Sequence, residues 1–126
     1  MLPSTREDSV MTRLLFADDS EDLRHLAGIV FDHTSWELTT VQDGQEALDV
    51  WAGDDFDIVV LDVKMPGTNG IDVARRIREG GFEGPIVLWT SWEGMVPATD
   101  AVRLDVQVLP KLDVTVLRTF VNELRR

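Results

Sequence analysis

Residues 56–62 read Phe56-Asp57-Ile58-Val59-Val60-Leu61-Asp62, and they decide the fold class of this chain. The stretch is nearly all apolar, and the apolar run stops at a carboxylate. A run of this kind is typical of a central parallel strand, because helices cover both faces of such a strand. We therefore expect an α/β fold in which Asp62 follows the central strand.

Shorter apolar runs and amphipathic segments alternate on both sides of this stretch. Apolar residues at helical spacing follow each run, which is the pattern of strand-helix units. The predicted strands cover residues 14–17, 36–41, 56–61, 86–89 and 106–109, and the predicted helices lie around residues 23–31, 47–51, 70–79, 96–104 and 114–124. We expect Asn69 and Asp113 to cap the third and fifth helices, and Pro97 to lie near the first turn of the fourth.

Five strand-helix units in regular alternation predict a doubly wound, five-stranded parallel sheet with helices on both faces. The expected strand order is 2-1-3-4-5, the flavodoxin-like arrangement, in which the ligand crevice lies at the carboxyl ends of strands one and three. Polar residues stand at these strand ends. They are Asp18 and Asp19 after the first strand, Asp62 after the third, Thr90 after the fourth and Lys111 after the fifth.

Three carboxylates at one rim repel one another unless their pKa values rise or a cation neutralises them. A hard divalent ion fits this need, since Mg2+ prefers about six oxygen ligands and keeps several waters. We predict that Asp19 and Asp62 bind Mg2+ directly. Lys64 is expected to contribute its backbone carbonyl, and Asp18 to act through a water molecule.

The same rim suggests phosphoryl chemistry. An aspartate can attack phosphorus to form an acyl phosphate, and a metal neutralises the equatorial oxygens in the transition state. Asp62 is the predicted nucleophile because it closes the most buried strand. Lys111 offers a compact positive charge to the phosphoryl oxygens and is expected to pair with Asp62 in their absence. Thr90 supplies a hydroxyl that can bond a phosphoryl oxygen.

These residues resemble the response-regulator receiver domain of bacterial two-component signalling. The resemblance runs from Arg13 to the C-terminus, and its order and spacing are highly specific. It is carried by residues 16–20 (Phe-Ala-Asp-Asp-Ser), residues 57–67, Thr90-Ser91 and Lys111. It implies phosphotransfer from a histidine kinase or phosphotransfer protein to Asp62, Mg2+ dependence, and signalling through the fourth helix, fifth strand and fifth helix. It also implies that the small Ser91 leaves room for Thr90 to move.

The chain departs from the family pattern after the fourth strand. Leu112 follows Lys111 where the family has a proline with a cis bond, so we expect a trans bond, since a cis bond without proline costs about 2.5–4 kcal/mol. Val108 stands where the family has a switch aromatic. We therefore expect the signal to pass through the loop after Thr90, with Trp92 as its large movable side chain. Lys64 and Trp92 are also expected to shield the phosphorylated state from water.

Size and charge limit the other possibilities. The chain has 126 residues, a net charge of −11 and no cysteine, which suits one domain and disfavours direct binding to nucleic acid or an anionic membrane. Residues 1–11 are expected to form a disordered tail and residues 12–126 the receiver domain. The expected compartment is the cytoplasm, and the expected partners are a kinase or phosphotransfer protein and an unidentified downstream protein.

Two other classes of function stay open at this point. A pseudo-receiver would keep the fold and bind proteins without phosphorylation, which Val108 and Leu112 favour and the intact set of polar residues opposes. An aspartyl phosphatase of the haloacid-dehalogenase type would be a true enzyme. Such sites need a second aspartate two positions after the nucleophile, and Lys64 occupies that position here. We therefore expect a signalling domain rather than an enzyme.

Overall fold

The computed structural model of the protein describes residues 11–31, 35–91 and 93–124. The tail expected over residues 1–11 lies outside these ranges, apart from Met11, and so does Trp92. In the described part of the chain, no helix has both the length and the apolar character needed to cross a membrane.

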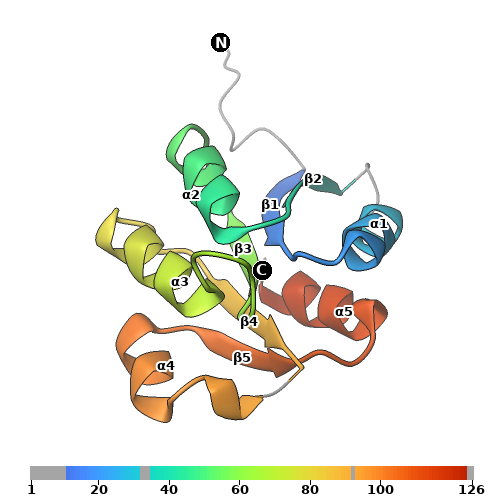
Figure 1. The fold of residues 1–126 in the computed structure, drawn as a ribbon. Helices are drawn as coiled ribbons and strands as arrows, with labels where there is room; N and C mark the ends of the chain where they lie inside the picture. Colours follow the sequence, from blue (N-terminus) through green and yellow to red (C-terminus); the bar gives the residue numbers. More distant parts are fainter. Residues whose placement is uncertain (1–10, 32–34, 92, 125–126) are drawn as a thin grey trace.

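Five strands alternate with five α-helices in the described ranges (Figure 1). The first half of the chain contains β1 (Thr12–Ala17), α1 (Glu21–Val30), β2 (Trp36–Val41), α2 (Gly44–Ala52) and β3 (Ile58–Asp62). The second half contains α3 (Gly70–Glu79), β4 (Ile86–Thr90), the 3-10 turn η2 (Glu93–Met95), α4 (Ala98–Leu104), β5 (Gln107–Pro110) and α5 (Val114–Leu124).

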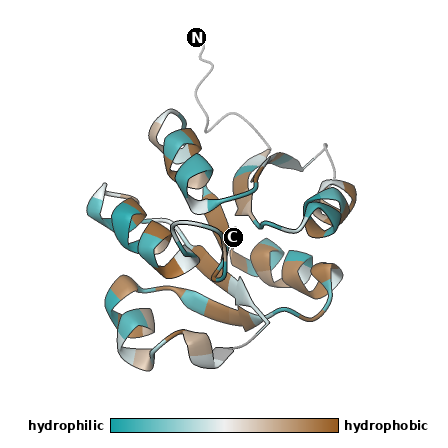
Figure 2. Cartoon of the chain, viewed as in Figure 1, coloured by the Kyte–Doolittle hydropathy of each residue, from teal (hydrophilic) through white to brown (hydrophobic). Residues whose placement is uncertain are grey.

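The strands form one parallel sheet in the order β2-β1-β3-β4-β5, which confirms the predicted flavodoxin-like topology. Helices α1 and α5 cover one face, and α2, α3 and α4 cover the other (Figure 1). Hydrophobic and hydrophilic residues alternate along the helices (Figure 2), and the buried apolar residues of the helices join the two clusters that cover the sheet. Every residue of β3 and β4 is buried, as expected for strands covered on both faces.

The uniform apolar run of β3 serves two separate cores. Val59 and Leu61 join the cluster under α2, α3 and α4, whereas Ile58 and Val60 join the cluster under α1 and α5. This division follows from the alternation of side chains along a strand. Full burial of each such side chain is worth about 1.5–3 kcal/mol, so β3 anchors both layers at once.

The fourth helix corrects one expectation. It was predicted to begin at residue 96, but it begins at Ala98, with Pro97 as its N-cap in an extended conformation (φ −59°, ψ 139°). The physical reason is that a residue before proline disfavours the helical region, so Val96 cannot belong to the first turn. The cap provides no side-chain hydrogen bond, and η2 occupies part of the preceding segment.

The last strand also differs slightly from its predicted bounds. It ends at Pro110, which a sheet tolerates on an edge strand such as β5. The Lys111 N–H donates to the Thr90 carbonyl at 2.7 Å, so the β4–β5 ladder continues one residue past the proline. All peptide bonds in the described ranges are trans, including the one between Lys111 and Leu112, as expected.

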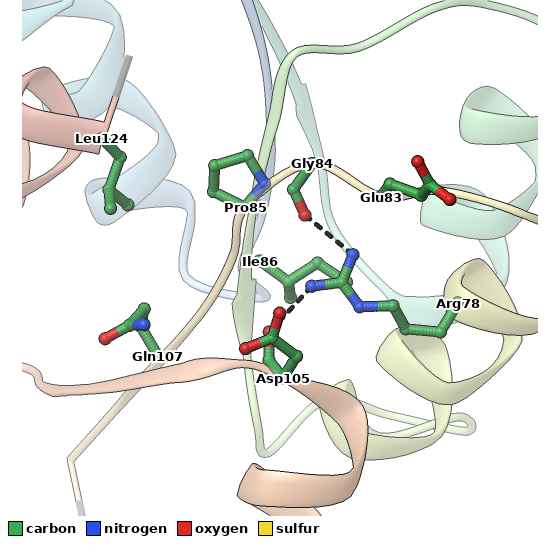
Figure 3. A pocket seen from close by; sticks show the side chains of 8 residues that line it. All are labelled: Arg78, Glu83, Gly84, Pro85, Ile86, Asp105, Gln107 and Leu124. Atoms are coloured by element: carbon green, nitrogen blue, oxygen red, sulfur yellow. Dashed lines mark hydrogen bonds between the residues drawn. The ribbon is translucent and has the colours of Figure 1, made fainter. Parts of the chain in front are cut away.

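Arg78 of α3 bonds backbone carbonyls near the amino ends of β4 and β5, at the end of the sheet opposite Thr90 and Lys111. Its Nε donates to the Leu104 carbonyl at 2.7 Å and its Nη2 to the Asp105 carbonyl at 2.8 Å, which caps the carboxyl end of α4. Its Nη1 donates to the carbonyls of Phe82 and Gly84 at 2.9 and 2.7 Å. Figure 3 shows this guanidinium in a hollow of about 220 Å³ near the amino ends of β4 and β5. One side chain thus joins α3, the loop before β4 and the α4–β5 turn.

We predict that Arg78→Met lowers the free energy of unfolding by about 2–4 kcal/mol, because four carbonyls lose a charged donor. Arg75→Met is the matched control on the same helix. Arg75 pairs with Asp72 at the surface and, within the described ranges, with no other residue, so that change should cost less than about 1 kcal/mol. Urea unfolding followed by circular dichroism measures both. If both variants lose the same free energy of unfolding, the bonds of Arg78 to the four carbonyls do not stabilise the fold.

Candidate functional site

The acidic rim is set by the pairing of β1 with β3. Ala17 is the register partner of Leu61, so the next residues along the two strands, Asp18 and Asp62, emerge side by side. Carboxylate oxygens of Asp18, Asp19 and Asp62 all lie within 4.8 Å of one another. Asp18 and Asp62 are buried and Asp19 is exposed, so the cluster opens to solvent on the Asp19 side.

Lys111 follows the edge strand β5, and its side chain extends to this cluster. Its Nζ lies 2.8 Å from Asp18 Oδ2 and 3.2 Å from Asp62 Oδ2. The backbone bond to Thr90 fixes the start of its side chain, and the ammonium is mostly shielded from water. The sequence predicted the pair with Asp62. The structure adds Asp18, whose contact with the ammonium is the shorter of the two.

Two residues to which the sequence analysis assigned no role donate hydrogen bonds to Asp18. The Ser20 N–H donates to Asp18 Oδ1 at 2.9 Å, and Arg24 Nη1 donates to the Asp18 carbonyl at 2.8 Å. Ser20 is also the N-cap of α1, because its Oγ accepts from the Leu23 N–H at 3.2 Å. A serine before two acidic residues is a recognisable helix start, so the sequence carried a signal for Ser20. It carried none for Arg24.

Gly70, the first residue of α3, packs directly against the backbone of Asp62. Its N–H donates to the Val63 carbonyl at 2.8 Å, and a Cβ on Gly70 would lie 2.2 Å from the Asp62 backbone oxygen. Only glycine fits this contact between α3 and the end of β3. The Lys64 N–H lies 3.4 Å from Asp62 Oδ1, while the Lys64 side chain is exposed.

Burial and charge both act on Asp62. Loss of solvent is the largest effect and the Asp18 carboxylate adds to it, while Lys111 opposes both, so the pKa of Asp62 rises to about 6. Asp18 Oδ2 is buried and has the Lys111 ion pair but no hydrogen bond from the residues that the structure describes. Three carboxylates therefore face one ammonium. An all-oxygen donor set with excess negative charge and one open side fits a hard divalent cation such as Mg2+.

The remaining predicted residues come from the end of β4, the segment after it and the middle of β5. Thr90 ends β4 and is buried, and Ser91 after it is exposed. Val108 is half-buried and packs against the cluster under α2, α3 and α4. The expectation for Trp92 falls on a residue outside the described ranges. The roles assigned to these side chains stay predictions.

Comparison with known proteins agrees with this geometry. The family model of the response regulator receiver domain matches residues 14–112. The response regulator SaeR of Staphylococcus aureus is 32% identical over 81 residues, which cover 64% of this chain and 35% of SaeR. The chain thus spans about a third of the length of the curated relatives it matches.

Two solved structures share the fold at similar identity. The response regulator TrrA of Thermotoga maritima, in complex with Mg2+-BeF, has a TM-score of 0.79 and 29% identity, covering 90% of this chain and 99% of TrrA. TrrA in complex with the histidine kinase ThkA has a TM-score of 0.77 and 29% identity, covering 90% of this chain and 98% of TrrA.

The doubly wound sheet and its acidic cluster define a two-component signalling module. The chain belongs to the response regulator receiver domain family.

The raised pKa of Asp62 predicts a pH-dependent cost of folding in the absence of divalent ions. Folded Asp62 binds its proton more tightly than unfolded Asp62, so its contribution to stability falls as pH rises from about 4 to about 6. Asp62→Asn should therefore gain about 1–2 kcal/mol over the parent at pH 8, after allowance for screening at the rim, and almost nothing at pH 4.

Urea unfolding in EDTA across this pH range measures the difference. Asp22→Asn on the exposed first turn of α1 is the control, with no pH-dependent gain expected. A constant difference between parent and Asp62→Asn would contradict the assignment of the shift to Asp62.

Proposed function

We propose that this receiver domain accepts a phosphoryl group on Asp62 from a histidine kinase or phosphotransfer protein and signals by a change of conformation. The observation that carries the proposal is the contact set of Asp62: one carboxylate lies against Asp18, Asp19 and Lys111 at the open end of the central strand. This makes the chain a signalling domain that assists its own phosphorylation, rather than an enzyme with a separate substrate.

Mg2+ is the cofactor of this proposal. Asp19 and Asp62 are its proposed direct ligands, with the Lys64 backbone carbonyl, while Asp18 acts through water. The excess of carboxylates over ammonium at the rim supports a divalent cation, and TrrA, a relative at 29% identity, was solved with Mg2+-BeF. When bound, the ion neutralises charge on the phosphoryl oxygens.

The chain's own residues carry the transfer. A carboxylate oxygen of Asp62 forms a bond to phosphorus while the bond from phosphorus to the donor's imidazole nitrogen breaks, and the imidazole takes up a proton. Asp62 attacks in its ionised form, which the Lys111 ammonium favours by lowering the pKa of Asp62. Lys111 exchanges its contact with Asp62 for the phosphoryl oxygens, and the Thr90 hydroxyl bonds one of them.

A protein phosphodonor is supported by apolar residues exposed on the helices of one face of the sheet. Large apolar side chains are exposed on α1, on α5 and just after Lys111: Leu26, Ile29, Leu112 and Val116. Helices α1 and α5 pack together on one face of the sheet, so their exposed apolar residues offer contacts to a protein partner (Figure 1). The solved complex of TrrA with the kinase ThkA supports the same class of partner.

The output side of the proposal is less usual for the family. Val108 has a short, β-branched side chain with one preferred rotamer, so its rotation changes little surface. We propose that engagement of Thr90 acts instead on the loop from Ser91 and on the start of α4, where the N-cap has no side-chain hydrogen bond. The downstream partner is a protein of unknown identity. The net charge of −11 opposes direct binding to nucleic acid, and the proposed compartment is the cytoplasm.

A pseudo-receiver that binds partners without phosphorylation is the second candidate. Val108 and Leu112 favour it, because both replace residues that the family uses in its switch. The contacts of Lys111 with both carboxylates oppose it, since a binding module has no need to bury that charge cluster.

We predict that millimolar Mg2+ raises the melting temperature of the parent by about 2–5 °C, because the ion binds only the folded cluster. Asp19→Asn should lose at least half of this rise. Asp22→Asn removes an equally exposed carboxylate outside the cluster and should respond like the parent. Differential scanning calorimetry measures the shift. An undiminished response in Asp19→Asn would remove Asp19 from the site.

We predict that acetyl phosphate and Mg2+ add one labile phosphoryl group to the parent and to Asp22→Asn, and none to Asp62→Asn. Mass spectrometry of the intact protein, or mobility on a Phos-tag gel, measures the labile phosphoryl group. Label that persists in Asp62→Asn would move the nucleophile elsewhere. A parent that binds Mg2+ but takes no label from acetyl phosphate or a kinase would favour the pseudo-receiver.

A further inference from the structure

Trp89 places an aromatic ring against the ammonium of the site. Trp89 is the register partner of Asp62 on β4 and is 1% exposed. Lys111 Nζ lies over its ring, 5.4 Å from the ring centroid. A cation within about 6 Å of an indole face is attracted by the ring, and tryptophan is the best of the aromatic residues at this. Lys111 therefore has three neighbours: two carboxylates and one ring.

These three contacts differ in what phosphorylation does to them. The ion pairs with Asp18 and Asp62 use carboxylate oxygens that the proposed metal and phosphoryl group also need. Both pairs must weaken when the site is occupied. The ring carries no formal charge and takes no part in the chemistry, so its attraction for the ammonium is the same before and after transfer.

The position of Trp89 is costly for a residue that serves packing alone. Its indole N–H is buried and meets no acceptor among the described residues. A buried donor without a partner destabilises a fold, and a phenylalanine or leucine there would avoid this cost. Phe16 of β1 packs against the indole with ring centroids 5.9 Å apart at 56° and so fixes its plane. The ring is held in the orientation that Lys111 meets.

We infer that Trp89 is a positioning residue for Lys111: its ring face keeps the ammonium at the rim while Asp18 and Asp62 are occupied by cation and phosphoryl group. This inference rests on the proposed function for its purpose, but the contact itself belongs to the unphosphorylated protein. It can therefore be tested without any phosphodonor.

The variants distinguish the attraction between the Trp89 ring and the ammonium from the packing of an apolar side chain at this position. Trp89→Phe keeps a ring face, and Trp89→Leu removes it. Trp36→Phe and Trp36→Leu are the controls, because Trp36 is equally buried, lies at the start of β2 and packs edge-on against Phe31. Circular dichroism and thermal unfolding establish that the variants fold. If Trp89→Leu does not fold, Lys111→Met supplies the test from the other side of the contact.

The first readout is NMR of the protein without ligands. In the parent and in Trp89→Phe, the ring should shift the Lys111 side-chain protons upfield and keep the ammonium ordered; in Trp89→Leu the upfield shift should vanish. In Lys111→Met the indole N–H signal of Trp89 should move while that of Trp36 stays. A Lys111 signal that is the same in parent and Trp89→Leu, or an indole signal indifferent to Lys111→Met, overturns the inference.

The second readout is binding of beryllofluoride with Mg2+, a phosphoryl mimic. Trp89→Leu should bind about three- to tenfold more weakly than the parent, and Trp89→Phe should stay within about twofold. The Trp36 variants should bind like the parent. Unchanged binding by Trp89→Leu overturns the positioning role. A parent that binds no beryllofluoride overturns the proposed function instead, and the ligand-free comparison alone then decides on Trp89.

Discussion

Two buried carboxylates held side by side are the constraint on which the rest of this structure depends. Asp18 and Asp62 follow the paired positions Ala17 and Leu61, so the parallel ladder between β1 and β3 leaves them no room to separate. Their mutual repulsion and loss of solvent raise the pKa of Asp62, and Lys111 offsets only part of that. A cation bound between these carboxylates offsets their repulsion. The repulsion that lowers the stability of the protein without a ligand therefore favours the proposed Mg2+.

The fold keeps stability and chemistry at opposite ends of the sheet. The carboxyl ends of the strands hold the acidic cluster, and the amino ends of β4 and β5 hold Arg78 with its four backbone acceptors. Arg78 caps the carboxyl end of α4, whereas the amino end of α4 begins at Pro97 without a side-chain cap. A helix fixed at one end only can move at the other. This asymmetry supports the proposal that Thr90 acts on the start of α4, since Val108 offers little movement of its own.

Several neighbours of the site were beyond sequence reasoning for definite reasons. Arg24 reads as an ordinary exposed cation on an amphipathic helix, and only the turn before α1 brings it to the Asp18 carbonyl. Gly70 reads as a helix start, and only the packing of α3 under β3 makes a Cβ impossible there. Trp89 is one apolar residue of a predicted strand, and nothing in the sequence singles it out. Its contact with Lys111 depends on the register of β4 against β5 and on the distance between two side chains, and the predicted strand order gives neither.

The sequence by itself determined the fold class, the strand order and the rim residues. Periodicity and burial pattern are local properties, and a parallel sheet converts strand ends into one edge by a general rule. It also determined the caps at Asn69 and Asp113, which depend on neighbours a few residues away. The tertiary structure alone decided that Lys111 lies closer to Asp18 than to Asp62, and that an indole ring lies beside the ammonium. These outcomes depend on how far apart side chains from separate strands come to rest, and that distance is fixed only when both cores have packed.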